Sequence, residues 1–362
     1  MPPSRDALET SYAFCRQLSR RAGSNFYAGF LLLPKEKRRG MEALYAFMRC
    51  TDDLADQGSE VRSQGSGVRG QGSGVRGQGS GVRGQGPETP SFQISKSPNQ
   101  ELHRREAIAA WRAALQQALA ATGSAVQLPP QLVDLPPQHV VPPSALRPPP
   151  SAPPSALLPA LADVVRCFHI PHEHLLAVID GVEMDLTPRR YETFDELERY
   201  CERVASAVGL ACIHIWGFRG PEAFEPARQA GVALQLTNIL RDLREDTAAG
   251  RVYLPLADLR RCGYSEQELL AGTANDAFLD LMRFEIERAK QFYRAAAGLW
   301  DWLAPDGRRI FGLMTATYRQ LLAQIERRPA DVLRRRVRLS PLTKLGLFAR
   351  WLLFPHDSST LK

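Results

Sequence analysis

Apolar residues recur every three or four positions along most of the chain, which is the spacing that buries one face of an α-helix. The pattern predicts helices over residues 7–21, 34–56, 103–121, 161–167, 172–184, 194–216, 227–246, 278–303 and 308–328. Pro34 suits the first turn of its helix, and Ser265 followed by Glu268 is typical of a capping box. No stretch alternates apolar and polar residues as a strand does. We therefore predict an all-α fold.

Two segments interrupt the helical pattern. Residues 62–86 repeat every seven positions, but each repeat has one apolar residue and several glycines, too little to offset the entropy of the chain. Residues 127–159 are rich in proline, which blocks helix and sheet and favours extended conformations. We expect a single domain over residues 1–362, interrupted by two disordered inserts. A solvated excursion is favoured for the second insert over a ligand for a proline-binding module.

The composition indicates the size of the core, the surface charge and the cellular location of this domain. Hydrophobic residues make up 44% of the chain, enough for a sizeable core, and Lys plus Arg exceed Asp plus Glu by 46 to 39. The excess fits an ordinary basic surface, anionic substrates or a membrane surface. The six scattered cysteines form no C-x-x-C pair and indicate reduced thiols. The polar first ten residues indicate no signal peptide, and no apolar run is long enough to span a bilayer. We expect a cytoplasmic protein, with a peripheral position on the inner face of the cell membrane as the alternative.

The candidate chemistry lies on two predicted helices that carry carboxylates at helical spacing. On the first, Tyr45, Arg49, Asp52 and Asp56 are separated by four, three and four residues, which places them on one stripe. On the second, the stripe consists of Gln235, Asn238, Asp242 and Asp246. We call these the first and second acidic stripes.

A solvated helix face is the ordinary explanation for such carboxylates. Against it, like charges four residues apart repel, the arrangement occurs twice, and each stripe continues into residues that suit a cavity wall. Carboxylates on a rigid helix suit Mg²⁺, which binds through one or two of them together with substrate phosphates. Arg49 and Arg241 stand beside the stripes and can fork onto phosphate oxygens. The pattern favours a metal-dependent site for a diphosphate.

At these residues the sequence resembles the squalene/phytoene synthase family. YAFMRCTDDLAD at residues 45–56 is similar to the family's first aspartate-rich region, and QLTNILRDLREDTAAGRVYLP at residues 235–255 to its second. Residues 180–210 resemble the segment between them, and GSNFYAGFLLLP at residues 23–34 resembles the N-terminal substrate region. The resemblance covers nearly everything outside the two inserts. It implies an all-α isoprenoid-synthase fold with a central cavity.

The resemblance also implies roles for individual residues. The metal ligands would be Asp52, Asp56, Asn238, Asp242 and Asp246. The catalytic residues would be Asp52, Asp56, Asp242, Asp246, Tyr45 and Arg49. Substrate would contact Ser24, Phe26, Tyr27, Tyr200, Val204, Ala205, Gly209, Gln235, Asn238 and Arg241, with the small side chains on the helix from Tyr200 lining the prenyl channel. The cofactor would be Mg²⁺, with Mn²⁺ as the alternative ion.

The implied reaction joins two prenyl diphosphates head to head with loss of diphosphate. The VEMDL and GLACIHIWGF segments look closer to bacterial presqualene diphosphate or squalene synthases, which use farnesyl diphosphate, than to phytoene synthases, which use geranylgeranyl diphosphate. NADPH is needed only if squalene is the final product. The chain departs from the family in reading SNFY where many members have SFY, and in the repeat that begins six residues beyond Asp56, near the family's flap.

Two other functions compete. Asp52 to Asp56 also fits the D-D-x-x-D motif of head-to-tail prenyltransferases and terpene cyclases, but the second stripe fits neither of the second motifs found in those enzymes. Some relatives of the family are non-catalytic assembly factors that have lost metal-binding aspartates, whereas all five candidate ligands are present here. No feature indicates nucleic-acid binding.

Two weaker features remain. The histidines of HIPHEH, residues 169–174, are interpreted as solvated or capping residues at a helix start, in preference to a zinc site. The segment Leu339 to Phe354 is apolar with Lys344 and Arg350 interspersed. It either lies on a membrane surface or packs on the core as a final helix, and the sequence does not choose between the two.

Overall fold

The computed structural model describes residues 4–21, 27–56, 98–120, 153–187 and 189–354, with only the backbone of residues 55–56 and 98–100. These residues are helical apart from their connections and one isolated β-bridge between Phe218 and Leu303. The all-α prediction is confirmed. The elements are α1 Arg5–Arg21, α2 Tyr27–Phe30, α3 Lys35–Asp56, α4 Pro98–Ala120, η2 Pro154–Leu157, α5 Leu158–Phe168, α6 His172–Met184, α7 Phe194–Cys201, η3 Glu202–Ser206, α8 Ala207–Trp216, η4 Pro221–Ala223, α9 Phe224–Arg241, α10 Leu243–Ala248, α11 Leu256–Arg261, α12 Glu266–Ala271, α13 Asp276–Ala296, α14 Leu299–Trp302, α15 Pro305–Arg327, η5 Pro329–Leu333 and α16 Pro341–Leu353.

Most predicted helices appear close to their expected bounds. α6 matches its prediction residue for residue, whereas α4 begins five residues earlier than expected. The capping box before α12 is confirmed, because the Ser265 side chain accepts from the Glu268 backbone and the Glu268 side chain accepts from the Ser265 backbone. The single helix predicted over residues 194–216 is continuous but contains a π-helical turn, η3, between α7 and α8.

The predicted extent of the proline-rich insert is wrong at its C-terminal end. Residues 154–157 form η2, and α5 begins at Leu158. Ser155, Leu157 and Leu158 are buried, and the Ser11 hydroxyl donates to the Ala156 carbonyl oxygen over 2.7 Å. Proline is tolerated in the first turn of a helix, so Pro154 and Pro159 start these elements instead of blocking them. Residues 127–152 and the glycine-rich repeat at 62–86 lie outside the described residues.

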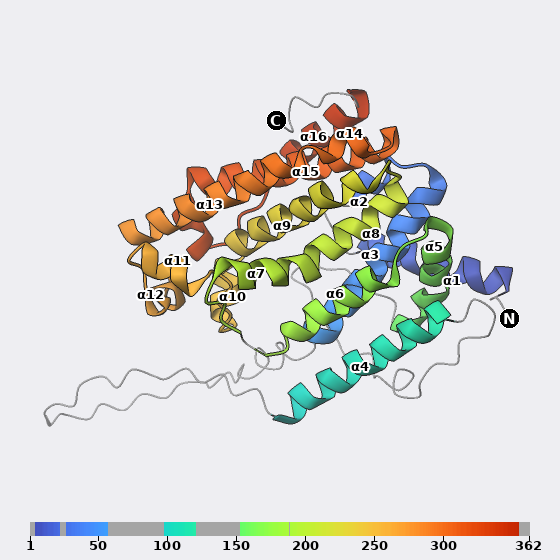
Figure 1. Cartoon of the computed structure of the whole chain (residues 1–362), viewed down its shortest axis with the longest axis horizontal. Coiled ribbons are helices and arrows are strands. Elements are labelled where there is room, and N and C mark those ends of the chain that lie inside the picture. The colour runs from blue at the N-terminus through green and yellow to red at the C-terminus, as the bar shows by residue number, and fades with distance from the viewer. Residues whose placement is uncertain (1–3, 22–26, 57–97, 121–152, 188, 355–362) are drawn as a thin grey trace, which may run out of the picture.

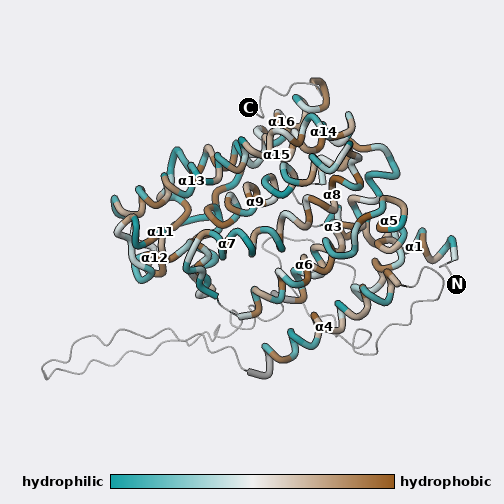
Figure 2. The backbone as a smooth tube through the Cα atoms, viewed as in Figure 1, coloured by the Kyte–Doolittle hydropathy of each residue, from teal (hydrophilic) through white to brown (hydrophobic). Residues whose placement is uncertain are grey.

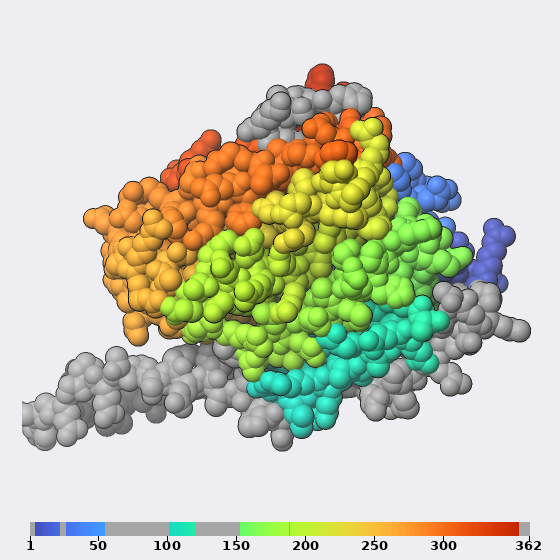
Figure 3. Space-filling model, in the orientation of Figure 1, coloured from blue at the N-terminus to red at the C-terminus, as the bar shows by residue number. Residues whose placement is uncertain are grey.

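α9 is the central helix of the bundle (Figure 1) and packs against α13, α8, α15 and η3. One part of the core lies among α1, α3, α4, α5, α6 and α8, and the other lies among α7, α9, α13 and the short helices α10 to α12. Figure 2 shows apolar residues on the inward sides of these helices and polar residues on their outer sides. α4 forms a ridge along the lower edge of the molecule (Figure 3) and contacts α3, α5 and α6.

Two glycines let three helices approach closely around the π-helical turn. A Cβ added to Gly181 of α6 would lie 2.5 Å from a methyl carbon of Val204, and one added to Gly231 of α9 would lie 2.4 Å from Cα of Ser206. Such distances exclude any larger residue unless the backbone shifts. The contacts fix the position of η3 between α6 and α9, and η3 follows directly on Tyr200 and Cys201.

Two further findings bear on the sequence predictions. All six cysteines are free, as expected, and four of them are buried. Within the part of the chain that the structure describes, no helix has both the length and the apolar character to cross a membrane.

Candidate active site

The first acidic stripe lies at the C-terminal end of α3 and is held by a buried anchor. The Thr51 hydroxyl donates to the Phe47 carbonyl oxygen over 2.8 Å and accepts from Nε1 of Trp111 over 2.9 Å. The rings of Phe47 and Trp111 stack with their centroids 6.0 Å apart, so this face of α3 is fixed in the core. The opposite face carries the polar residues of the stripe, and Asp52 is exposed.

The other members of the first stripe differ in their exposure and in their contacts. Arg49 is exposed and pairs with Asp53 over 2.8 Å, so its guanidinium already lies beside a carboxylate. Tyr45 is partly buried and meets Phe30 edge to face with the centroids 6.1 Å apart. Asp56 is the last residue of α3, and its side chain lies outside the described atoms.

The second acidic stripe crosses a break between two helices, where a single helix was predicted. α9 ends at Arg241, and Asp242 has φ −102° and ψ 11° before α10 begins at Leu243. The backbone hydrogen bonds Asp242 N–H to Asn238 O and Asp246 N–H to Asp242 O, each 2.9 Å, keep helical spacing through the break. Asn238, Asp242 and Asp246 therefore still follow one another along one side. The three residues thus share one side as predicted, but the helix bends at Asp242.

Asp242 is clamped by two guanidinium groups. Arg241 donates to both carboxylate oxygens of Asp242, over 2.7 and 2.5 Å, and Arg336 donates to the same two oxygens over 2.9 and 3.1 Å. Arg336 comes from the segment after η5, 94 residues along the chain. Sequence reasoning missed it because a run of three arginines carries no signal for a distant carboxylate.

Asn238 supplies an unpaired oxygen beside this clamp. Its amide nitrogen donates to Oε1 of Gln235 over 3.3 Å. Its Oδ1 is buried and has no hydrogen-bond partner among the described residues. A buried acceptor without a donor is costly, and a bound cation would satisfy it.

Asp246 is in an environment that disfavours its charge. Burial, followed by repulsion from Asp242, raises its pKa to about 7, with smaller contributions in the same direction from Asp185 and Glu245. The Arg251 guanidinium acts in the opposite direction. Additional positive charge at this position would favour the carboxylate form.

Tyr200 belongs to an aromatic cluster centred on one carboxylate. Its hydroxyl donates to Asp185 over 2.8 Å, and the Tyr253 hydroxyl donates to the other oxygen of Asp185 over 2.9 Å. The rings of Tyr200 and Tyr253 stack at 5.3 Å, and Tyr191 lies 5.6 Å from Tyr200. Burial, followed by the charge of Asp185, raises the pKa of Tyr200 well above its usual value, so this phenol stays protonated. Asp185 belongs to the VEMDL segment, but the sequence pattern did not indicate it as a site residue.

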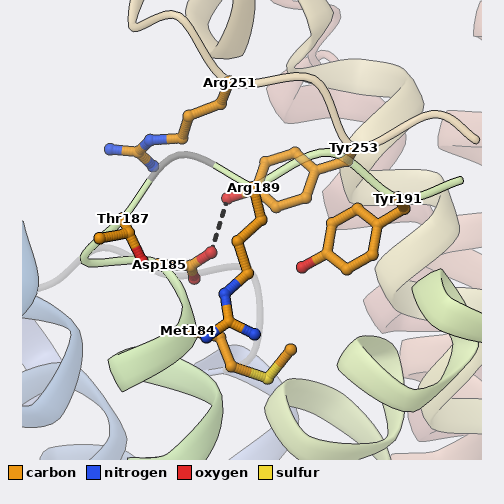
Figure 4. A pocket seen from close by; sticks show the side chains of 7 residues that line it. All are labelled: Met184, Asp185, Thr187, Arg189, Tyr191, Arg251 and Tyr253. Atoms are coloured by element: carbon orange, nitrogen blue, oxygen red, sulfur yellow. Dashed lines mark hydrogen bonds between the residues drawn. The ribbon is translucent and has the colours of Figure 1, made fainter. Parts of the chain in front are cut away.

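A small pocket opens beside this cluster (Figure 4). It lies between the end of α6, the loop before α7 and the loop after α10. Asp185, Tyr191 and Tyr253 of the cluster form part of its wall. The lining residues are Met184, Asp185, Thr187, Arg189, Tyr191, Arg251 and Tyr253. The sequence did not predict Arg189 and Arg251, which bring two guanidinium groups to the wall close to the second stripe.

The predicted substrate residues outside the stripes fall into two groups. Val204 and Ala205 lie in η3 and Gly209 in α8, all partly buried. A Cβ added to Gly209 would lie 3.3 Å from the Ala227 carbonyl oxygen, so this glycine lies against α9.

The second group is the N-terminal substrate region. Tyr27 starts α2, where its hydroxyl accepts from Nε of Arg20 over 2.9 Å. Ser24 and Phe26 lie outside the described residues.

The donor set of the second stripe fits a hard cation. Asn238, Asp242 and Asp246 offer only oxygen atoms, one of them an unpaired amide oxygen. Among the described residues no group of three or more His, Cys, Asp and Glu side chains is arranged to enclose an ion. The all-oxygen donor set of Asn238, Asp242 and Asp246 is typical of Mg²⁺, which keeps water and phosphate oxygens among its ligands. HIPHEH likewise forms no metal group among the described residues.

Comparisons with known proteins agree on one family. A family model described as squalene/phytoene synthase matches residues 19–343. A 15-cis-phytoene synthase from Synechocystis is 31% identical over 96% of this chain and 86% of its own. A phytoene synthase from Arthrospira platensis is 30% identical over 90% of this chain and 87% of its own.

Solved structures share the fold. A dehydrosqualene synthase in complex with a ligand matches with a TM-score of 0.68 and 21% identity, covering 96% of this chain and 98% of its own. Squalene synthase HpnC from Alicyclobacillus acidocaldarius matches with a TM-score of 0.64 and 23% identity, covering 90% of this chain and 95% of its own. At these identities the likeness establishes the helical fold alone.

Proposed function

Because this chain belongs to the squalene/phytoene synthase family, we propose that its two acidic stripes bind the diphosphate groups of its substrates during head-to-head condensation. The chain is a prenyltransferase of the squalene/phytoene type, and prenyl diphosphates are the substrates of this family. The observation that carries the proposal is the second stripe. Two guanidinium groups, two carboxylates and an unpaired amide oxygen meet there beside an aromatic cluster.

The family uses a divalent metal to bind diphosphate. We propose Mg²⁺ here, with Mn²⁺ as the alternative. The residues that would hold it are Asp52, Asp56, Asn238, Asp242 and Asp246. When bound, the metal supplies positive charge that neutralises the leaving diphosphate. The pKa of Asp246 and the unpaired oxygen of Asn238 both support a cation at the second stripe.

The arginines beside the stripes orient the diphosphates. Arg241 is fixed by its fork onto Asp242, whereas Arg336 comes from an exposed segment and shares the same carboxylate. With a cation bound at Asp242, Arg336 would be able to form a bidentate contact with phosphate oxygens. Arg49 would serve the first stripe in the same way, from its pair with Asp53.

The aromatic cluster serves the carbocation that forms when an allylic C–O bond breaks and diphosphate leaves. The double bond of the second substrate captures this cation, and loss of a proton closes a cyclopropylcarbinyl diphosphate that retains the second diphosphate. Tyr200 and Tyr253 present stacked rings whose hydroxyls are both committed to Asp185. Aromatic faces stabilise cations, so the two stacked rings would favour a cation formed beside them.

For the chain length of the substrate we propose farnesyl diphosphate, giving presqualene diphosphate or squalene. The VEMDL and GLACIHIWGF segments at the end of α6 and in α8 support this choice. The second candidate is geranylgeranyl diphosphate, and it is favoured by the names of the curated relatives, which are phytoene synthases. NADPH would be needed only for reduction to squalene.

Mass analysis of the products tests both the proposed type of reaction and the proposed chain length of the substrate. The purified chain with Mg²⁺ is incubated with farnesyl or geranylgeranyl diphosphate, each with and without NADPH. We expect a C30 product from farnesyl diphosphate, whereas a C40 product formed only from geranylgeranyl diphosphate would establish the second candidate. A product that requires isopentenyl diphosphate as co-substrate would instead indicate head-to-tail transfer. No product, together with no rise in melting temperature on adding Mg²⁺ and a substrate analogue, would indicate a non-catalytic relative.

We also propose that the enzyme works as a peripheral protein on the inner face of the cell membrane. Prenyl chains and their condensation products partition into lipid, so the substrates concentrate at this surface. The apolar C-terminal segment supports this location.

A further inference from the structure

α16 presents apolar residues on two opposite faces. On the inner face Trp351 is 1% exposed and lies against α15, where a Cβ added to Gly312 would be 2.2 Å from its ring. Trp300 of α14 adds a ring 5.6 Å away. These contacts confirm that the final helix packs on the core, one of the two outcomes that the sequence left open. They leave the opposite face without a core to cover it.

The outer face carries a row of exposed leucines. Leu342, Leu345 and Leu353 are 80, 63 and 68% exposed, and their spacing of three and eight residues places them on one side of the helix. Gly346 lies on the same side, and nothing lies within 4 Å of a Cβ added there. Outside α16, the exposed leucines among the described residues are Leu31, Leu102 and Leu270, each in a different part of the chain. A continuous exposed apolar row, in contrast, marks a binding surface.

The charged side chains of the segment that carries this row are all basic. Residues 334–354 contain six Lys or Arg and no Asp or Glu. Arg338 and Lys344 are exposed, and Arg335 pairs with Asp331 of η5 over 2.7 Å. A helix with an apolar side and surrounding cations suits the surface of an anionic membrane, where leucines enter the acyl boundary and cations meet the headgroups.

We propose that α16 docks on an anionic lipid surface through Leu342, Leu345 and Leu353. A second copy of the chain fits this face less well, because a symmetric dimer would bring the exposed Arg338 and Lys344 of each copy close to those of the other. The proposal deepens the peripheral location proposed above by naming its surface. It depends on α16 and not on the acidic stripes, so the two proposals can fail separately.

Vesicle co-sedimentation tests the docking surface. The full chain is mixed with phosphatidylcholine vesicles, with or without phosphatidylglycerol, and compared with a double variant, Leu345→Glu with Leu353→Glu. We expect the wild type to bind phosphatidylglycerol vesicles, more weakly in high salt, and the double variant to bind at least about tenfold more weakly, since two leucines no longer enter the bilayer. The matched control is Leu102→Glu, because Leu102 is 55% exposed on α4. It should bind as the wild type does.

Three outcomes would overturn the proposal. These are unchanged binding by the double variant, equal loss in the Leu102→Glu control, or a wild-type dimer in sedimentation velocity that the double variant abolishes. Circular dichroism melting checks that both variants fold. Turnover with detergent-dispersed substrate should stay at the wild-type level in the double variant, because α16 provides no residue of the acidic stripes.

Discussion

The two acidic stripes have the same spacing in the sequence but different surroundings in the structure. The first follows a regular helix that is anchored by Thr51 and Trp111, and its Asp52 is exposed to water. The second crosses a helix break, its Asp242 lies under two guanidinium groups, and its Asp246 has a pKa raised to about 7. Figure 1 places the end of α3 and α10 on the same lower side of the bundle. Spacing thus decides which side chains share a face, whereas the packed neighbours decide their charge.

The difference suggests a division of labour. An exposed carboxylate keeps its charge at little cost and can take up a hydrated cation directly. A partly buried cluster has to be charge-balanced before any ligand arrives, and Arg241 and Arg336 provide that balance at Asp242. We expect the second stripe to contribute to both folding and catalysis, and the first to catalysis alone.

Asparagine substitution of one carboxylate in each stripe should have the largest effect. Asp52→Asn and Asp242→Asn should each lower kcat by about 10²–10⁴-fold, because each removes charge that would hold the metal near the leaving group. Only Asp242→Asn should also lower the melting temperature, since it leaves Arg241 and Arg336 facing a neutral amide. Steady-state kinetics and thermal melting measure the two effects. Near-normal turnover in either variant would contradict the catalytic role of that stripe. Equal shifts in melting temperature would contradict the proposal that only the second stripe contributes to folding.

Removing the charge of Asp185 should have the next largest effect. In Asp185→Asn the amide can accept from only one of the two tyrosine hydroxyls, so Tyr200 and Tyr253 lose their common acceptor. We expect kcat to fall about 10–100-fold with a smaller change in KM. The matched control is Tyr264→Phe, which also loses a buried tyrosine hydrogen bond, 2.8 Å to the Thr273 carbonyl oxygen, but lies beside α12. Equal loss of kcat in both variants would mean that the cluster is only structural.

Arg336→Gln should raise the KM for the prenyl diphosphate about tenfold, with kcat reduced less, because the fork on Asp242 and its proposed phosphate contact are lost. Arg335→Gln is the matched control, since the neighbouring arginine pairs with Asp331 away from the stripe. Inorganic diphosphate should correspondingly stabilise the wild type more than Arg336→Gln in thermal melting. A similar rise in KM in both variants would show that only the local positive charge matters.

A buried carboxylate outside both stripes provides the smallest test. Burial raises the pKa of Glu285 to about 7, although Arg288 bonds to it over 2.7 Å. A carboxyl whose pKa is higher in the folded than in the unfolded state gives stability that is complete below 4.5 and is lost as pH rises through 7. Between these pH values the free energy of unfolding should therefore fall by about 1–2 kcal/mol less in Glu285→Gln than in the wild type. Urea titrations across this pH range measure it, and the difference between the wild type and Glu285→Gln should be the same with and without Mg²⁺.

The sequence predicted most of the fold because helical spacing is a local property. α6 and the capping box at Ser265 were found residue for residue. The bend at Asp242 was not found, and neither was the π-turn at Glu202–Ser206, which packs against Gly231 of α9. The prolines at 154 and 159 misled the prediction, since their first-turn positions became visible only with the packing of η2 on Ser11.

The candidate site was predictable to a similar degree and for the same reason. Both stripes are local patterns, so their residues were identified from spacing. Arg336 and Asp185 act through partners far along the chain, at Asp242 and at Tyr200 and Tyr253, and no local pattern encodes such a contact. The roles of all these residues stay predictions, and for Asp56, Ser24 and Phe26 the side chains also lie outside the described atoms.

The short link between Arg336 and α16 limits the distance between the second acidic stripe and any membrane on which α16 rests. Five peptide steps join Arg336 to Pro341, the first residue of the helix, and five extended residues span at most about 17 Å. If α16 rests on a bilayer, Asp242 is held within roughly that distance of the plane of the headgroups, allowing for the length of one side chain. A prenyl diphosphate would then reach the acidic residues without its tail fully leaving the lipid, and any lengthening of this link would raise the barrier to delivery.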